Sequence, residues 1–187
     1  DSLIVRLNSG NTSSAELEQA TRKSQSWVST ALRSLIDQRR VVRIGSRRGA
    51  RYALRRDIPP IGSAWPLYRV GRDGEPVELG MLYALVVDEF YLEANKAATA
   101  AGFAVASLSS GIPYLLQDQR PGGFLGRSIP QRFPQLHAPP RTQDWTDEHY
   151  LRYLTTYGSD GVGDLILGRA ALDDYLLQFR QLVPRDA

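Results

Sequence analysis

The chain has 187 residues, enough for one or two domains, and its 42% hydrophobic content is ordinary for a globular protein. No apolar run approaches the roughly 18 residues of a membrane span, and no basic stretch leads into the apolar core of a secretory signal. The chain has no cysteine, which excludes disulfides, thiol nucleophiles and Cys-ligated zinc. We therefore expect a soluble, cytoplasmic protein without a membrane partner.

Charge is distributed unevenly along the chain. Residues 1–56 contain 12 of the 23 Lys and Arg residues and 4 of the 20 Asp and Glu residues, a net charge of +8. Residues 57–187 have a net charge of −5. Because a basic module attracts polyanions and an acidic one repels them, this asymmetry indicates a polyanionic partner for the first segment only.

Three helices are predicted in the first 56 residues. Leu3 and Leu7 lie one turn apart on the first, which the turn-forming run NSGN ends. Ser13 and Glu16 have the spacing of a capping box, which predicts the start of the second helix. Ser24 is a residue type that caps helix N-termini, and it precedes a third helical pattern.

The third helix has two contrasting faces. At about 100° per residue, one sector is apolar and contains Val28, Ala31, Leu32 and Leu35. The opposite sector is short and polar and contains Ser26, Thr30 and Arg33, with Ser29 and Trp27 on its flanks. The outer face of an ordinary core helix carries long charged residues instead. This face therefore predicts close approach to another molecule.

A basic β-hairpin is predicted after the third helix. Val42 and Ile44 alternate with charge, GSRRGAR supplies a glycine-flanked turn, and Tyr52 and Leu54 begin the return strand. Three helices followed by a basic hairpin give the element order of a winged helix-turn-helix DNA-binding domain. In such domains the third helix lies in the major groove, where short side chains permit close approach and polar groups contact base edges.

This fold predicts two sets of contacts with double-stranded DNA. From the third helix, base edges would be contacted by Gln25, Ser26, Ser29, Thr30 and Arg33. Phosphates would be contacted by Lys23 and by the hairpin residues Arg47, Arg48 and Arg51. Such domains commonly bind two half-sites as dimers, so a homodimer is also considered. The simpler alternative is a small helical module whose polar face is only solvated.

The stretch SQSWVSTALRSL resembles the recognition helix of winged-helix regulators, which often read S-Q-x-T-V-S-x-x-L-x-x-L. It differs from them at the preceding turn, where Arg22 and Lys23 replace the usual glycine and apolar residue. Trp27 is interpreted as a residue that packs at the rim of the helix and does not stack on bases.

Residues 57–66 are interpreted as a linker, because prolines and a glycine interrupt regular structure there. The predicted domains are therefore residues 1–56 and residues 67–187. Beyond the linker, the runs LYRV, VELGMLYAL and FYLEA, with Asp73 and Gly74 in the first turn, predict an antiparallel meander.

The rest of the second domain is predicted to be mixed. Helices are expected over residues 94–106, 147–157 and 170–179. Thr146 or Asp144 would cap the second of these, and SDGVGDLILG would turn into a strand. RPGGFLGR, residues 120–127, is interpreted as a Pro-Gly turn beside a packing Phe124. The expected fold class is α+β, with a small antiparallel sheet and helices after the winged helix-turn-helix.

No catalytic, cofactor-binding or metal site is predicted in these residues. GSDGVGDLILG has glycines but lacks the lysine and the spacing of a phosphate-binding loop. His137 and His149 do not have the spacing of a zinc site. Asp147 and Glu148 begin a helix, where its dipole favours acidic residues, so they do not indicate acid–base chemistry.

Three segments of the second domain resemble, in order, the N-terminal subdomain of HipA-like toxin kinases: LYRVGRDGEPVELGMLY, GIPYLLQDQRPGGFLGRSI and YGSDGVGDLILG. The middle segment resembles F-F-x-N-L-L-P-D-x-x-x-R, with comparable residues at Tyr114, Leu115, Leu116, Asp118, Pro121 and Arg127. A winged helix fused ahead of this subdomain is similar to the YjjJ branch of that family.

The resemblance implies a toxin–antitoxin protein whose front portion binds DNA and regulates transcription of its own operon. It also implies that the kinase part, with ATP and Mg, lies downstream of Ala187, so no cofactor is expected here. Two alternatives stay open. The chain would be the N-lobe fragment of an active Ser/Thr protein kinase toxin, or an antitoxin-like subunit that binds a separate HipA-like kinase chain.

Overall fold

The computed structural model describes residues 2–45, 49–102, 107–160 and 163–182. The chain divides into two compact units. The first unit comprises Asp1–Ala64, Leu82–Glu93 and Val105–Gly111, and the second comprises Trp65–Met81, Ala94–Ala104 and Ile112–Ala187. Helices and antiparallel strands both occur, which confirms the predicted α+β class.

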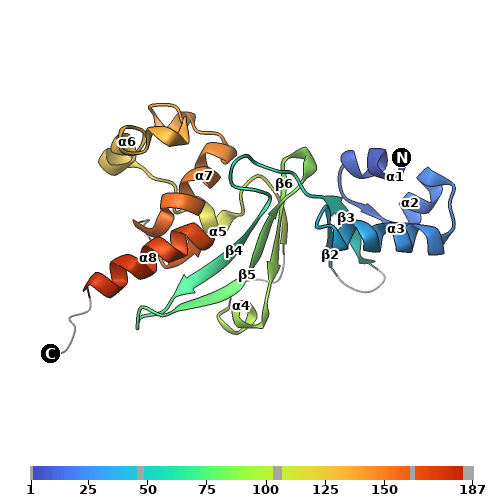
Figure 1. Cartoon of the computed structure of the whole chain (residues 1–187), viewed down its shortest axis with the longest axis horizontal. Coiled ribbons are helices and arrows are strands. Elements are labelled where there is room, and N and C mark those ends of the chain that lie inside the picture. Colours follow the sequence, from blue (N-terminus) through green and yellow to red (C-terminus); the bar gives the residue numbers. More distant parts are fainter. Residues whose placement is uncertain (1, 46–48, 103–106, 161–162, 183–187) are drawn as a thin grey trace. The chain divides into compact units, whose positions relative to one another are not determined.

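The first unit begins with helices followed by a hairpin (Figure 1). In chain order its elements up to residue 54 are α1 (Ser2–Asn8), β1 (Thr12–Ser13), α2 (Ser14–Thr21), α3 (Gln25–Asp37), β2 (Val41–Ile44) and β3 (Arg51–Leu54). The three helices and both hairpin strands confirm the sequence prediction. The short strand β1 is an addition, and it pairs with β3.

Side-chain caps explain where α2 and α3 begin. The Ser13 hydroxyl accepts a hydrogen bond from the Glu16 N–H at 3.3 Å, and the Glu16 carboxylate accepts one from the Ser13 N–H at 2.7 Å. The Ser24 hydroxyl accepts one from the Trp27 N–H at 3.3 Å. These bonds satisfy N–H groups that have no partner inside the helix, and they confirm both predicted helix starts.

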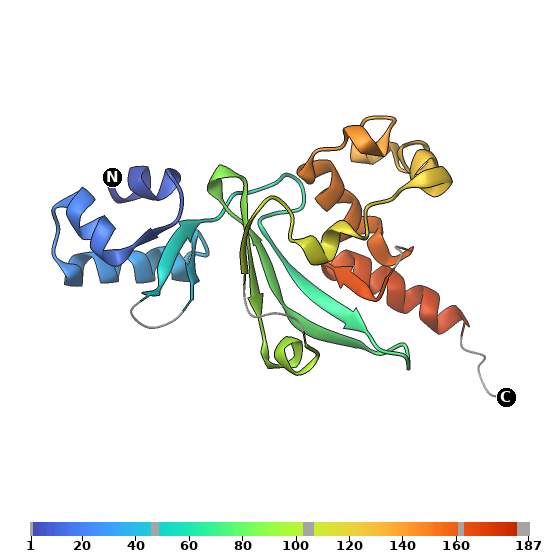
Figure 2. The same ribbon diagram turned by 180° about the vertical axis from the view of Figure 1, so that it is seen from behind.

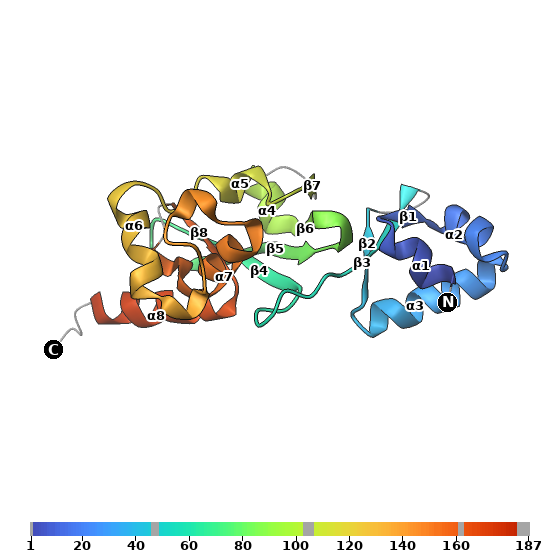
Figure 3. The same ribbon diagram turned by 90° about the horizontal axis from the view of Figure 1, so that it is seen from above.

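The three helices enclose an apolar core together with the hairpin (Figure 3). Its buried members are Leu3, Leu7, Leu17, Val28, Leu32, Val41 and Leu54. Leu7, Leu17 and Val28 are completely buried. Since full burial of one such side chain contributes about 1.5–3 kcal/mol, this core fixes the orientation of α3 on the hairpin.

Side chains alternate between the two faces of β2 and β3, and this gives the hairpin a second apolar face. The two strands pair antiparallel, with Val42 opposite Ala53. Because successive side chains point to opposite faces of a strand, these two residues face away from the helix core. They pack with Leu85 and Tyr91, which belong to residues 82–93 of the same unit. The hairpin is thus covered on both sides.

Residues 57–66, expected to be a linker, contain packed structure. Ile58 is completely buried, and its N–H donates to the Gly62 carbonyl at 2.9 Å. Strand β4 begins at Ala64 and includes Pro66, which was expected to interrupt regular structure. Pro66 precedes the residues Leu67–Arg69 that pair with β8, and its carbonyl accepts a hydrogen bond from the Gly168 N–H at 2.8 Å.

A five-stranded sheet has the order β7-β6-β5-β4-β8. Its strands are β4 (Ala64–Val70), β5 (Pro76–Ala84), β6 (Glu89–Ala94), β7 (Ser107–Ser110) and β8 (Leu165–Leu167). Consecutive strands β4, β5 and β6 are neighbours, which confirms the predicted meander. Gly74 in the first turn has a φ of +80°, a conformation that glycine adopts readily.

The helices of the second unit are formed by the later part of the chain (Figure 2). They are α4 (Lys96–Ala100), α5 (Tyr114–Gln117), α6 (Gly123–Arg132), α7 (Asp147–Tyr157) and α8 (Arg169–Leu182). The α7 bounds confirm the prediction, and Thr146 is its cap. Helix α8 packs on the sheet through Ala171 and Leu172, which contact Tyr68 and Ile166.

Two predictions in the second unit differ from the structure. The helix expected over residues 94–106 ends at Ala100, and Gly102 follows with a φ of +76°, while residues 103–106 lie outside the described part of the chain. The turn expected over residues 120–127 is wrong in its second half, because α6 begins at Gly123. The side chain of Phe124 also lies outside the described residues.

The Glu16 carboxylate connects α2 to both neighbouring strands. The Thr12 hydroxyl donates to it at 2.9 Å, and the Arg51 guanidinium lies 3.4 Å away. The Ser13 N–H, followed by the Thr12 and Ser13 hydroxyls, lowers the pKa of Glu16 from 4.5 to about 2. Hydrogen bonds to the charged form favour ionisation, so the ionised carboxylate stabilises the folded unit.

We expect the free energy of unfolding of the wild-type chain to decrease as the pH is lowered from about 4.5 to about 2. A lowered folded pKa contributes stability above the unfolded pKa, and protonation removes it as the pH falls. Chemical denaturation across this range checks the effect against Glu16→Gln, which keeps the shape of the side chain but cannot titrate. Identical pH dependence in the two proteins would contradict it.

We expect Leu85→Ala to lower the free energy of unfolding by about 2–5 kcal/mol, because it leaves a cavity beneath the hairpin. Leu85 is completely buried in the cluster with Val42 and Ala53. Amide hydrogen exchange in β2 and β3 should also accelerate. The matched control is Leu177→Ala, at a residue 60% exposed, with an expected change within about 0.5 kcal/mol. Unchanged exchange in β2 and β3 would show that residues 82–93 do not support the hairpin.

Candidate nucleic-acid interface

The polar face of α3 is open to solvent. Gln25, Ser26, Ser29, Thr30 and Arg33 are all exposed. On the other side of the helix, the buried side chains of Val28 and Leu32 enter the core. The Thr30 hydroxyl donates to the Ser26 carbonyl at 3.0 Å, so it retains lone pairs that can accept. The structure therefore brings all five of these predicted residues to one accessible surface.

The start of α3 presents a cation beside an aromatic ring. Lys23 is exposed, and its Nζ lies 6.0 Å from the centre of the Trp27 ring. Trp27 is itself 46% exposed. Arg22, at the turn where glycine was expected, has a φ of +54° and so adopts the left-handed conformation that glycine favours. The turn is thus formed without the expected residue type.

The structure describes only one of the three hairpin arginines that were predicted to contact phosphates. Arg47 and Arg48 lie outside the described residues. Arg51 is partly buried, and its guanidinium donates to the side chain and to the carbonyl of Asn11 as well as pairing with Glu16. Arg51 therefore has a structural role within the first unit, which the sequence did not indicate.

A pocket between α3 and the hairpin adds two residues that sequence reasoning missed. It has a volume of about 280 Å³ and is lined by Ser29, Leu32, Arg33, Ile36, Arg43 and Tyr52. Arg43 and Tyr52 lie directly opposite each other on β2 and β3. The available signal was the two-residue spacing from Val41 to Arg43, which puts a cation on the same face as a core residue.

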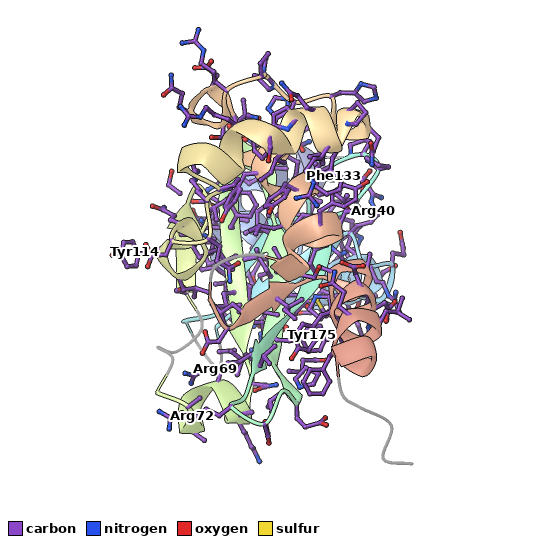
Figure 4. The ribbon with its side chains drawn as sticks, turned by 90° about the vertical axis from the view of Figure 1, so that its left-hand side faces the viewer. Arg40, Arg69, Arg72, Tyr114, Phe133 and Tyr175 are labelled. Carbon is purple, nitrogen blue, oxygen red and sulfur yellow. The ribbon has the colours of Figure 1, made fainter. Side chains whose placement is uncertain are left out.

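The second unit contains a larger pocket of about 550 Å³ on the α4 side of β4. Arg69, Arg72 and Asp164 lie at this pocket, with apolar residues such as Leu79. Arg69 donates to the Asp164 carboxylate at 2.6 Å. Arg69 and Arg72 lie beside α4, whereas Tyr175 lies on the α8 side (Figure 4). Since a carboxylate offsets one of its cations, this pocket is less suited to an anion than the α3 pocket.

The part of the chain that the structure describes contains neither a membrane-spanning helix nor a metal-binding cluster. No helix there is long and apolar enough to cross a bilayer, and no group of three His, Cys, Asp or Glu side chains is placed to hold a metal ion. His149 has a structural role, because its ring nitrogen accepts from the Thr146 N–H at the start of α7.

Comparisons with known proteins cover most of the chain. The family model described as "YjjJ-like toxin, middle domain" matches residues 61–176. The chain is 29% identical over 160 residues to Toxin YjjJ of Escherichia coli (strain K12), a match that covers 85% of this chain and 34% of that protein. The chain therefore spans about a third of the length of this curated relative. No solved structure matches it significantly.

The family match begins at Ile61, just before β4, and extends into α8. It includes all five strands of the sheet, β4 to β8. Because the match covers more than half of the sequence, the chain belongs to the YjjJ-like toxin family.

Proposed function

We propose that residues 2–56 form a winged helix-turn-helix domain that binds double-stranded DNA. The observation that carries the proposal is the exposed row of short polar side chains on α3, opposite the buried Val28 and Leu32. Helix α3 follows α2 after a short turn, and the β2–β3 hairpin follows α3, in the order that this fold requires. The order of the elements and the exposed polar row on α3 therefore both support the proposal.

The physical basis is close approach. A helix in the major groove needs small side chains for contact and polar groups for base edges, and Ser26, Ser29 and Thr30 supply both. Gln25 adds an amide, whose donor and acceptor complement adenine. The net charge of +8 over residues 1–56 supplies attraction to phosphates without regard to sequence.

The remainder of the chain is proposed to be a HipA-like N-terminal subdomain. Its support is the family match over residues 61–176 together with the three resembling segments, which fall on β4–β5, α5–α6 and β8. Within that proposal, the chain is the DNA-binding front of a toxin that regulates transcription of its own operon, and a homodimer would place two copies on two half-sites. ATP and Mg would belong to a kinase part outside these residues.

We expect affinity for duplex DNA to fall steeply with salt, because each phosphate neutralised by Lys or Arg releases a counterion. The logarithm of the binding constant should fall by about 0.9 per neutralised phosphate for each tenfold rise in salt. Mobility-shift titrations of the chain with DNA upstream of its gene, at about 50 and about 200 mM salt, measure this slope. A flat salt response, or no binding at the lower salt, would overturn the proposed function.

We expect Gln25→Ala to cost about 1–3 kcal/mol of binding at particular base positions and little at others, because an amide bidentate to adenine is lost. The preferred sequence is first selected from a randomised duplex library, and single base changes are then compared in competition titrations. Lys23→Ala is the control, and it should weaken all sequences alike. Equal weakening of all sequences by Gln25→Ala would show that Gln25 does not read bases.

A further inference from the structure

We propose that Arg33 and Arg43, with the Tyr52 hydroxyl, hold one phosphate of the DNA backbone in the pocket between α3 and the hairpin. The proposal rests on the proposed function. It adds Arg43 and Tyr52 to the interface, and it gives Arg33 a phosphate contact in place of the base contact expected from the sequence.

The core holds the two arginines in position. Arg33 directly follows the buried Leu32 on α3, and Arg43 lies two residues after the buried Val41 on β2. Leu32 and Val41 belong to the same apolar core. Tyr52 lies opposite Arg43 in the strand register, so both side chains are on one face of the hairpin. The three polar groups therefore line one pocket although they come from different elements.

The chemistry of the lining suits an anion. Arginine only donates hydrogen bonds, and the hydroxyls of Ser29 and Tyr52 are able to donate. Leu32 and Ile36 add apolar surface, and none of the described residues that line the pocket is a carboxylate. Two neighbouring cations without a carboxylate between them repel each other, and an anion placed between them removes that repulsion. Phosphate oxygens accept hydrogen bonds and carry the negative charge that the pocket lacks.

The position of the pocket favours a phosphate over a base edge. A recess between two elements accepts a group that protrudes from its partner. In a duplex the protruding anionic groups are phosphates, whereas base edges lie inside the grooves and are contacted by the outermost side chains. A guanidinium also binds two phosphate oxygens at once, which adds geometric specificity.

Neutral methylphosphonate linkages provide the test. The preferred duplex is prepared as a series, each member with one backbone phosphate replaced, and each is titrated with the wild-type chain and with Arg43→Gln, Arg33→Gln and Tyr52→Phe. The control is Arg40→Gln, which removes an exposed charge from the same unit at a residue that is not among those lining the pocket. Thermal unfolding verifies that each variant is folded.

The wild-type chain should lose roughly tenfold in affinity at one particular linkage. Arg43→Gln and Arg33→Gln should each bind the unmodified duplex about tenfold more weakly, for all base sequences alike, with the salt slope reduced by about one. Both variants should be insensitive to the linkage that affects the wild type. Replacement of the same phosphate should reduce the affinity of Tyr52→Phe by a smaller factor than it reduces that of the wild type. Arg40→Gln should lose affinity at the same linkage, and to the same extent, as the wild type.

The outcomes separate this proposal from the proposed function. If the wild-type chain binds DNA but Arg43→Gln behaves as Arg40→Gln does, the phosphate pocket is wrong and the proposed function stands. If Arg33→Gln loses affinity only at particular base pairs, Arg33 reads bases and the pocket is again wrong. If the wild-type chain binds no duplex, the proposed function fails and this proposal fails with it.

Discussion

The exposed surface of α3 depends on one packing constraint, the burial of its apolar side against the hairpin. Val28 and Leu32 enter the same core as Val41 and Leu54. Because an α-helix has about 3.6 residues per turn, burial of one side leaves the opposite positions in solvent. The polar row that we propose as a DNA-binding surface is therefore oriented by the core beneath it. The polar side chains do not have to make contacts within the protein to be held in this orientation.

The hairpin carries a second constraint, because it is packed on both faces. Its outer face contacts Leu85 and Tyr91. Beyond β3, the Arg55 guanidinium lies 5.4 Å from the centre of the Tyr83 ring, and burial followed by the nearby Glu93 raises the pKa of Tyr83 to about 12. The hairpin strands are braced by residues 82–93, which lie far from them in the sequence.

The cations of the first unit have different uses, although the sequence presents them as one basic group. Arg51 is held by Asn11 and Glu16 and so contributes to the folded unit. Arg33 and Arg43 line a pocket whose described lining residues include no carboxylate. Local charge density predicts attraction to a polyanion, but it does not distinguish a structural arginine from one available to a ligand. That distinction depends on which acceptors the fold brings within reach.

The sequence alone determined the three helices of the first unit, their caps at Ser13 and Ser24, and the polar face of α3, because these depend on contacts within a few residues. It also indicated the meander and the α7 cap. Only the tertiary structure decided that residues 57–66 contain packed chain, that Arg51 turns to Glu16, and that Arg33 and Arg43 share a pocket. Such pairings join distant residues, and they follow from how the elements pack, which local periodicity does not encode.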